Sequence, residues 1–155
     1  MRTFMWLTPL AGGFLAGCLD ITVDDFLDDT ALKEDEACPV IAHDVVTAAQ
    51  PLGQSVPIEA TVTDNTDGDT QEDGNESGVF EVRVFFRQET ATVWGTAVLT
   101  RLDESGAFGG SIPGQAVTGG GMAYYLYAAD RKRNACTLPG EGESDPWHFR
   151  VNVDD

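Results

Sequence analysis

The sequence predicts an all-β domain, a single antiparallel sandwich of two sheets with about seven strands. From Cys38 onward, apolar and polar residues alternate at a period of two, which is the period of a strand with one buried face. Gly, Pro, Asn and Asp separate these runs at the spacing typical of a sandwich. No stretch has an apolar repeat of about 3.6 residues, so helices are not expected.

The first three expected strands cover residues 41–49, 56–63 and 80–87. The first is an apolar run that ends before Pro51 and Gly53, two residues that terminate strands. The second and third alternate apolar residues with mostly polar ones, the exceptions being Pro57 and Phe85. This alternation predicts that each strand has one face on the core and one face in water.

The last four expected strands cover residues 92–102, 108–112, 122–128 and 147–154. Residues 92–102 are rich in Thr and Val around Trp94, and residues 103–106 predict the turn that follows. Residues 108–112 form a short strand that ends at Pro113. The strand 122–128 is expected to bury one face, which is formed by Met122, Tyr124, Leu126 and Ala128. Tyr125 and Tyr127 lie on the opposite face. The last strand alternates from Trp147 onward.

The start of the chain differs from the rest. Arg2 precedes a short apolar run, and the small residues Ala16 and Gly17 precede Cys18, as in an export signal. The run is too short, and too broken by Pro9, for a spanning helix of about 20 apolar residues. The tetrapeptide 15–18, Leu-Ala-Gly-Cys, resembles the lipobox of bacterial lipoproteins.

This resemblance implies cleavage before Cys18, a diacylglyceryl group on the Cys18 sulfur and acylation of the new amino terminus. Two or more acyl chains hold a protein stably, because each buried methylene contributes about 0.8 kcal/mol. Leu19, rather than Asp, follows the cysteine, which favours the outer membrane, with a periplasmic or surface-facing domain, over the inner membrane. The alternatives are an ordinary secretory signal with a chance cysteine and an uncleaved membrane anchor.

The chain therefore divides into a signal peptide (residues 1–17), a lipidated cysteine with an acidic tether (residues 18–37) and the β-sandwich (residues 38–155). In the tether, Lys33 is the single basic residue among many acidic ones, and the mutual repulsion of the acidic side chains favours an extended chain. Apolar residues within it, such as Phe26 and Leu27, leave open a segment that docks on the domain or binds a partner.

The charge and the cysteines restrict the function further. The formal net charge of −17 disfavours nucleic acid and anionic lipid surfaces as partners. With Cys18 linked to lipid, Cys38 and Cys136 remain, and an even pair in an oxidising compartment predicts a disulfide. Cys38 is expected just before the first strand, and Cys136 in the loop before the last strand. The alternative is two free buried thiols.

Three segments carry a second resemblance. Residues 57–64 and 82–87, and the Tyr-rich segment 119–130 that ends in Ala-Ala-Asp, are similar to the B, C and F strands of bacterial immunoglobulin-like or fibronectin type III-like modules. The resemblance spans residues 39–153 and implies an immunoglobulin-like sandwich. The loop 64–78 departs from it, because this loop is longer and more acidic than the usual B–C turn.

The acidic loop is the best candidate for a ligand site. Asp64, Asp67, Asp69 and Asp73 supply the oxygen ligands that calcium prefers, among glycines that allow the chain to wrap an ion. The helix-loop-helix calcium register fails, because Phe80 would take the position of the bidentate Glu. A solvated insertion is the favoured interpretation, and a looser calcium site is the alternative.

Other candidates are weaker. His43 and His148 lie on the first and last expected strands without a metal-binding spacing, and we expect both to be exposed. There is no G-x-S-x-G motif for a serine nucleophile. The basic run 131–133 is expected in a solvated turn, and at least one of Trp94 and Trp147 is expected in the core rather than facing a glycan.

The sequence thus predicts a membrane-anchored lipoprotein of the cell envelope that acts as a non-enzymatic interaction, adhesion or scaffold module. We expect a monomer without a cofactor, held to the membrane by its lipid, with an envelope protein or glycan as partner. The first alternative is a calcium- or glycan-binding module that uses the loop 64–78. An envelope hydrolase is the least favoured alternative.

Overall fold

The computed structural model describes residues 36–64 and 78–152. The chain divides into two units, Met1–Glu34 and Asp35–Asp155, and every described residue belongs to the second unit. The described residues form strands and two short 3-10 turns, η2 (Gly114–Ala116) and η3 (Gly142–Ser144). Within this part of the chain, no helix is both long enough and apolar enough to cross a membrane. The expected all-β class is therefore confirmed.

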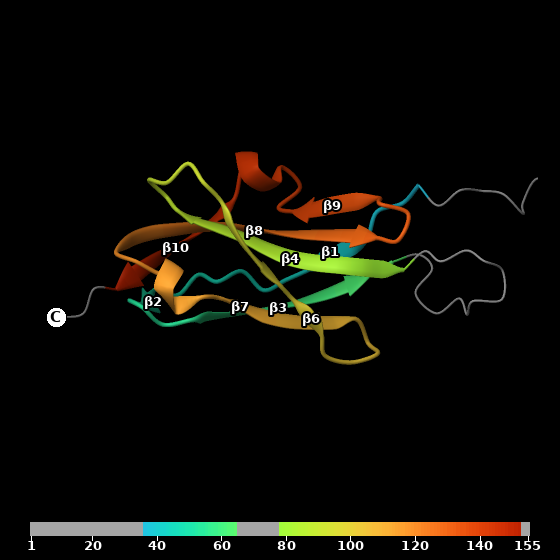
Figure 1. Ribbon diagram of the computed structural model, residues 1–155, viewed down its shortest axis with the longest axis horizontal. Helices are drawn as coiled ribbons and strands as arrows, with labels where there is room; N and C mark the ends of the chain where they lie inside the picture. Colours follow the sequence, from blue (N-terminus) through green and yellow to red (C-terminus); the bar gives the residue numbers. More distant parts are fainter. Residues whose placement is uncertain (1–35, 65–77, 153–155) are drawn as a thin grey trace, which may run out of the picture. The chain divides into compact units, whose positions relative to one another are not determined.

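The strands form two sheets (Figure 1). The first sheet has the order β1-β3-β7-β6 and contains β1 (Val40–Ala42), β3 (Val56–Thr63), β7 (Ala107–Ile112) and β6 (Thr100–Arg101). The second has the order β2-β10-β8-β4-β5 and contains β2 (Gln50–Pro51), β10 (Trp147–Asn152), β8 (Gly120–Asp130), β4 (Val79–Gln88) and β5 (Gly95–Val98). A further strand, β9 (Ala135–Leu138), pairs with β8.

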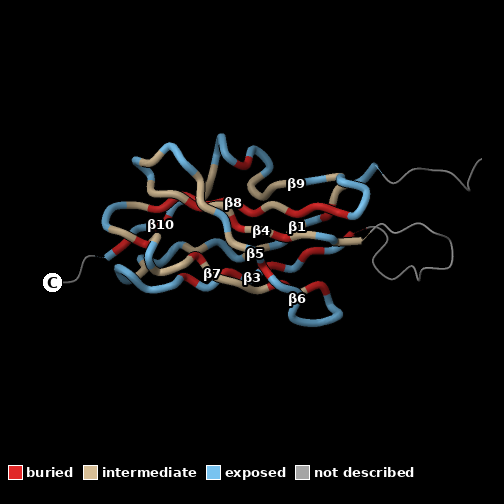
Figure 2. The backbone as a smooth tube through the Cα atoms, in the orientation of Figure 1, coloured by how far each residue is buried: buried red, intermediate tan, exposed pale blue. Residues whose placement is uncertain are grey.

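One core lies between the two sheets, and Figure 2 shows buried residues at intervals along their strands. The alternation of β3 is complete, since every second residue from Val56 to Val62 is buried and the residues between them are exposed. On β8 the expected face is also confirmed, because Met122, Tyr124, Leu126 and Ala128 all belong to the core. Burial of these apolar surfaces is the main stabilising contribution to the fold.

The prediction of one strand over residues 41–49 was wrong. β1 pairs with β3 only from Val40 to Ala42, and the chain then leaves the first sheet. It joins the second sheet at Gln50–Pro51, which pairs in parallel with the end of β10. The apolar residues between the two strands therefore serve a crossing between sheets, and their composition alone does not distinguish a crossing from a strand.

Residues 92–102 likewise form two short strands instead of one. β5 belongs to the second sheet and β6 to the first, and the buried Leu99 lies between them. The expected turn follows β6, where the Asp103 carboxylate accepts hydrogen bonds from Ser105 and from the backbone N–H of Ala107. These hydrogen bonds, above all the one from the Ser105 hydroxyl, lower the pKa of Asp103.

The strand β9 was not expected from the sequence, which placed Cys136 in a loop. The disulfide Cys38–Cys136 joins this strand to the segment that precedes β1, with a Cα–Cα distance of 5.6 Å. This distance lies within the usual range for disulfides. The expected pairing of these cysteines is present, and it ties the segment before β1 to the hairpin formed by β8 and β9.

Replacing both Cys38 and Cys136 with Ser should lower the free energy of unfolding by about 2–5 kcal/mol, because the cross-link closes a long loop in the unfolded chain. Urea denaturation of the oxidised wild type and the double variant measures this difference. Equal midpoints and slopes for the two proteins would contradict the prediction.

Candidate functional site

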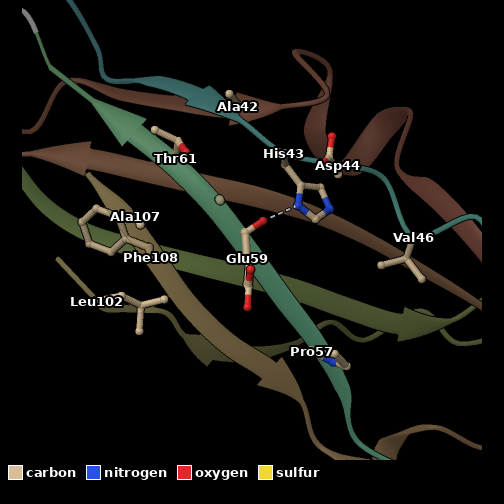
Figure 3. Close-up of a pocket in the computed structure, with 11 residues that line it drawn as sticks. Ala42, His43, Asp44, Val46, Pro57, Glu59, Thr61, Leu102, Ala107 and Phe108 are labelled. Carbon is tan, nitrogen blue, oxygen red and sulfur yellow. Dashed lines mark hydrogen bonds between the residues drawn. The ribbon is translucent and has the colours of Figure 1, made fainter. Parts of the chain in front are cut away.

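A hollow lined in part by polar groups lies beside β3, where β1 has left the first sheet. It is a cavity of about 460 Å³, and its lining includes His43, Asp44, Val46, Pro57 and Glu59 (Figure 3). β7 pairs with β3 from Val56 to Thr61, whereas β1 covers the other edge only from Thr61 to Thr63. The early departure of β1 therefore creates the opening.

On the open edge of β3, few backbone N–H and C=O groups remain for pairing with another strand. Val62 donates its N–H to Gly106 on the β7 side, so the backbone groups of Pro57 and Glu59 face the other, open side. Pro57 has no N–H to donate. The carbonyl of Glu59 is already bonded to His43 Nδ1, at 2.6 Å. Proline and a side chain thus protect this edge against pairing with another strand.

His43 is held by a chain of hydrogen bonds that reaches into the core. The backbone N–H of Val46 donates to the Tyr124 hydroxyl at 2.8 Å, and that hydroxyl lies 3.0 Å from His43 Nε2. The Glu59 carbonyl only accepts, so Nδ1 carries the hydrogen, and in the neutral ring Nε2 accepts a hydrogen bond from the Tyr124 hydroxyl. Trp147 packs against both rings, at centroid distances of 5.2 Å to His43 and 5.4 Å to Tyr124.

Tyr124 is fully buried, with 0% of its surface exposed. Burial raises the pKa of Tyr124 to about 12, because the phenolate would lose its hydration, and the hydrogen bond from Val46 opposes this only in part. The hydroxyl is therefore neutral under ordinary conditions and serves as a structural donor and acceptor. The sequence did not reveal this role. The expectation of an exposed His43 was wrong for the same reason, since its bond to Tyr124 holds the ring half-buried.

A second cavity, of about 470 Å³, is lined by Phe80, Asp130, Arg131 and Arg133. Asp130 is buried, and its carboxylate accepts hydrogen bonds at 2.8 Å from both the backbone N–H and the side-chain amide of Asn134. These bonds close the turn between β8 and β9. Asp130 at the end of the Tyr-rich strand therefore has a structural role, and the basic run 131–133 lies in the turn, as expected.

The outer face of the second sheet carries a group of aromatic side chains. Phe85 of β4 stacks on Tyr125 of β8 at 4.9 Å, and Trp94 meets Tyr125 edge-on at the same distance. The Arg87 guanidinium lies 4.6 Å from the Trp94 ring centroid. Burial, and then the nearby Glu143 carboxylate, raise the pKa of Tyr125. Both Trp94 and Trp147 are half-buried, and only Trp147 packs against the core.

The residues singled out in the sequence are not brought together into one site. Cys18, Asp67, Asp69 and Asp73 lie outside the described residues, and Asp64 is buried directly after β3, with 8% of its surface exposed. His148 is exposed on β10, as expected, and lies 2.9 Å from the Glu89 carboxylate. Across residues 36–64 and 78–152, no three His, Cys, Asp or Glu side chains are grouped to hold a metal ion.

No protein-family model matches the chain, and no match was found among the curated proteins.

Substituting Tyr124 with Phe should lower the free energy of unfolding by about 1–3 kcal/mol, because it leaves the Val46 N–H and the His43 ring without their partner. This loss of stability should also depend on pH. Below pH 10 the tyrosine is protonated in both the folded and the unfolded chain. Between pH 10 and about 12 only the unfolded chain ionises, so Tyr124 ceases to favour the folded state.

The measurement is the free energy of unfolding of wild type and Tyr124→Phe at a series of pH values from neutral to strongly alkaline. Wild type should lose about 3 kcal/mol more than the variant over this alkaline range. Tyr127→Phe, on the outer face of the same strand, is the matched control and should follow wild type. Parallel curves for wild type and Tyr124→Phe would contradict the buried role of the hydroxyl.

Proposed function

We propose that the protein is a lipoprotein of the bacterial cell envelope, anchored through Cys18, which presents an immunoglobulin-like sandwich as a non-enzymatic interaction, adhesion or scaffold module. The tetrapeptide 15–18, which resembles a lipobox, carries this proposal. The disulfide Cys38–Cys136 supports export, because such bonds persist in oxidising compartments. The absence of Asp after Cys18 favours the outer membrane.

The strand order supports an immunoglobulin-like arrangement. We assign the strands to those of an immunoglobulin domain as follows: A is β1, B is β3, C is β4, D is β6, E is β7, F is β8 and G is β10. In this assignment the first sheet has the order A-B-E-D. The second sheet then contains G-F-C in order. The edge strands β2, β5 and β9 are additions to this minimal set.

The roles of the described polar residues support an interaction module rather than an enzyme. His43 connects β3 with Tyr124, and His148 connects β10 with Glu89. Asp130 and Asp103 each close a turn by accepting backbone hydrogen bonds. These titratable side chains contribute to the scaffold, and the faces and edges of the two sheets remain as the surfaces for partners.

Substituting Cys18 with Ser should abolish lipidation and release the protein from the membrane fraction into the soluble envelope fraction. Intact mass of the membrane-bound wild type should correspond to a chain that begins at residue 18 with its acyl groups. Leu19→Asp is the matched control, because it preserves the lipidated cysteine and should transfer the protein from the outer to the inner membrane.

A wild-type chain that begins at any other residue, or that carries an unmodified Cys18 thiol, would refute the anchor. Retention of Cys18→Ser in the membrane fraction at the wild-type level would refute it as well.

A further inference from the structure

We propose that the hollow between the start of β4 and the turn after β8 binds a short acidic peptide segment of a partner protein. The turn supplies Arg131, Lys132 and Arg133, and β4 supplies Phe80 (Figure 1). The proposal rests on the proposed function, because it names a contact surface of an interaction module and the chemistry of its partner. It follows from the placement of Phe80, from the conformation of the turn and from the sign of its charge.

Phe80 faces solvent because the register of β4 changes at its first residues. The alternation of this strand would place Phe80 on the core face together with Val82. The pairing with β8 shifts between Val79 and Glu81, so Val79 packs against the core instead, and 70% of the Phe80 surface is exposed. Irregularities of this kind redirect a side chain at the end of a sheet. Here the exposed ring lines a hollow of about 470 Å³ together with two arginines.

The turn that carries the arginines has a fixed conformation. Arg133 has a φ of 72°, in the left-handed region that residues other than Gly rarely adopt. The Asp130 carboxylate accepts hydrogen bonds from the backbone N–H and the side-chain amide of Asn134, and the Arg133 N–H donates to the Asp130 carbonyl. Arg131 donates its N–H to the Gly78 carbonyl, next to β4. The backbone beside the hollow is therefore ordered before a partner binds, which lowers the entropic cost of binding.

The charge of the turn selects an anionic occupant. Residues 131–133 are the only three consecutive basic residues in a sequence with 9 basic and 26 acidic residues. Guanidinium groups bind carboxylates through two parallel, charge-assisted hydrogen bonds. Two of the chain's own carboxylates near the turn already have partners, since Asp130 bonds to Asn134 and Glu81 pairs with Arg83. A carboxylate supplied by a partner therefore gains attraction at this turn.

The acidity of the rest of the chain limits the occupant to a short segment. At physiological ionic strength charges are screened beyond about 8 Å, so one or two carboxylates at the turn are repelled little by distant acidic residues. An extended polyanion would also meet the acidic remainder of a chain whose net charge is −17. Phe80 adds an apolar contact, and aromatic and Arg side chains together are typical of protein interfaces. The occupant is thus a peptide segment in which an apolar residue neighbours Glu or Asp.

The test measures binding of a short rhodamine-labelled peptide, which alternates Glu and Leu, to the purified full-length protein in a neutral detergent. Fluorescence anisotropy should show saturable binding that weakens as NaCl is raised, because salt screens the attraction. A peptide with Gln in place of every Glu should bind about tenfold more weakly. Equal binding of the two peptides, or no binding of the Glu peptide to wild type, would overturn the proposal.

Arg133→Gly removes a guanidinium and preserves the turn, because Gly adopts a φ of 72° without strain. It should weaken binding of the Glu peptide about tenfold. Phe80→Ala should weaken it about threefold, since it removes an exposed ring outside the core. The matched control is Arg150→Gln, which removes the same charge at an exposed position of β10. An equal loss of binding in Arg150→Gln and Arg133→Gly would contradict the site, and thermal unfolding of each variant shows whether the fold is retained.

Two other occupants give distinct results. A variant with Asn in place of Asp67, Asp69 and Asp73 tests the acidic loop, which lies outside the described residues. If this variant binds the Glu peptide and wild type does not, the chain's own loop is the occupant and the proposal fails. Binding of polygalacturonate, an acidic polysaccharide, without binding of the Glu peptide would refute it as well. None of these outcomes affects the Cys18 anchor, whose own test is the mass and fractionation described above.

Discussion

The fold depends on how the Tyr124 side chain is accommodated between the two sheets. Its ring fills the core of the sandwich beside Trp147 and Phe149, and its hydroxyl requires a polar partner because it has no contact with water. The segment between β1 and β2 supplies this partner through Val46 and His43. The chain leaves the first sheet after Ala42, and the segment that crosses between the sheets supplies the hydrogen-bond partners of this buried hydroxyl.

The same crossing explains the cavity beside β3. Had β1 continued along its partner, it would have covered β3 as far as Val56, and no opening would exist there. The early departure exposes an edge, and the sequence protects it with Pro57 and with the hydrogen bond from His43 to Glu59. His43 thus has two functions, since it accepts a hydrogen bond from the buried Tyr124 hydroxyl and donates one to the Glu59 carbonyl, which another strand would otherwise bind.

The sequence was sufficient for features that depend on local patterns. The alternation in residues 56–63 and 122–128 identified the buried faces of β3 and β8, and the even pair of cysteines identified the disulfide. It was not sufficient where the outcome depends on distant contacts. The segment 41–49 leaves the first sheet and contacts the distant Tyr124, and the segment 92–102 changes sheet at the buried Leu99. Neither outcome can be read from the local pattern. The strand β9 is too short for its period to be recognised.

The charge of the chain and the position of its strands both limit self-association. Repulsion between acidic copies opposes contact at most of the surface, and central strands such as β7 and β8 have no free edge to pair with another chain. At an edge the same composition has a different consequence, because unpaired backbone groups and β-branched side chains favour the addition of a strand. The open edges of β2 and β3 carry proline, and the edge strand β6 carries Arg101, which limits such additions.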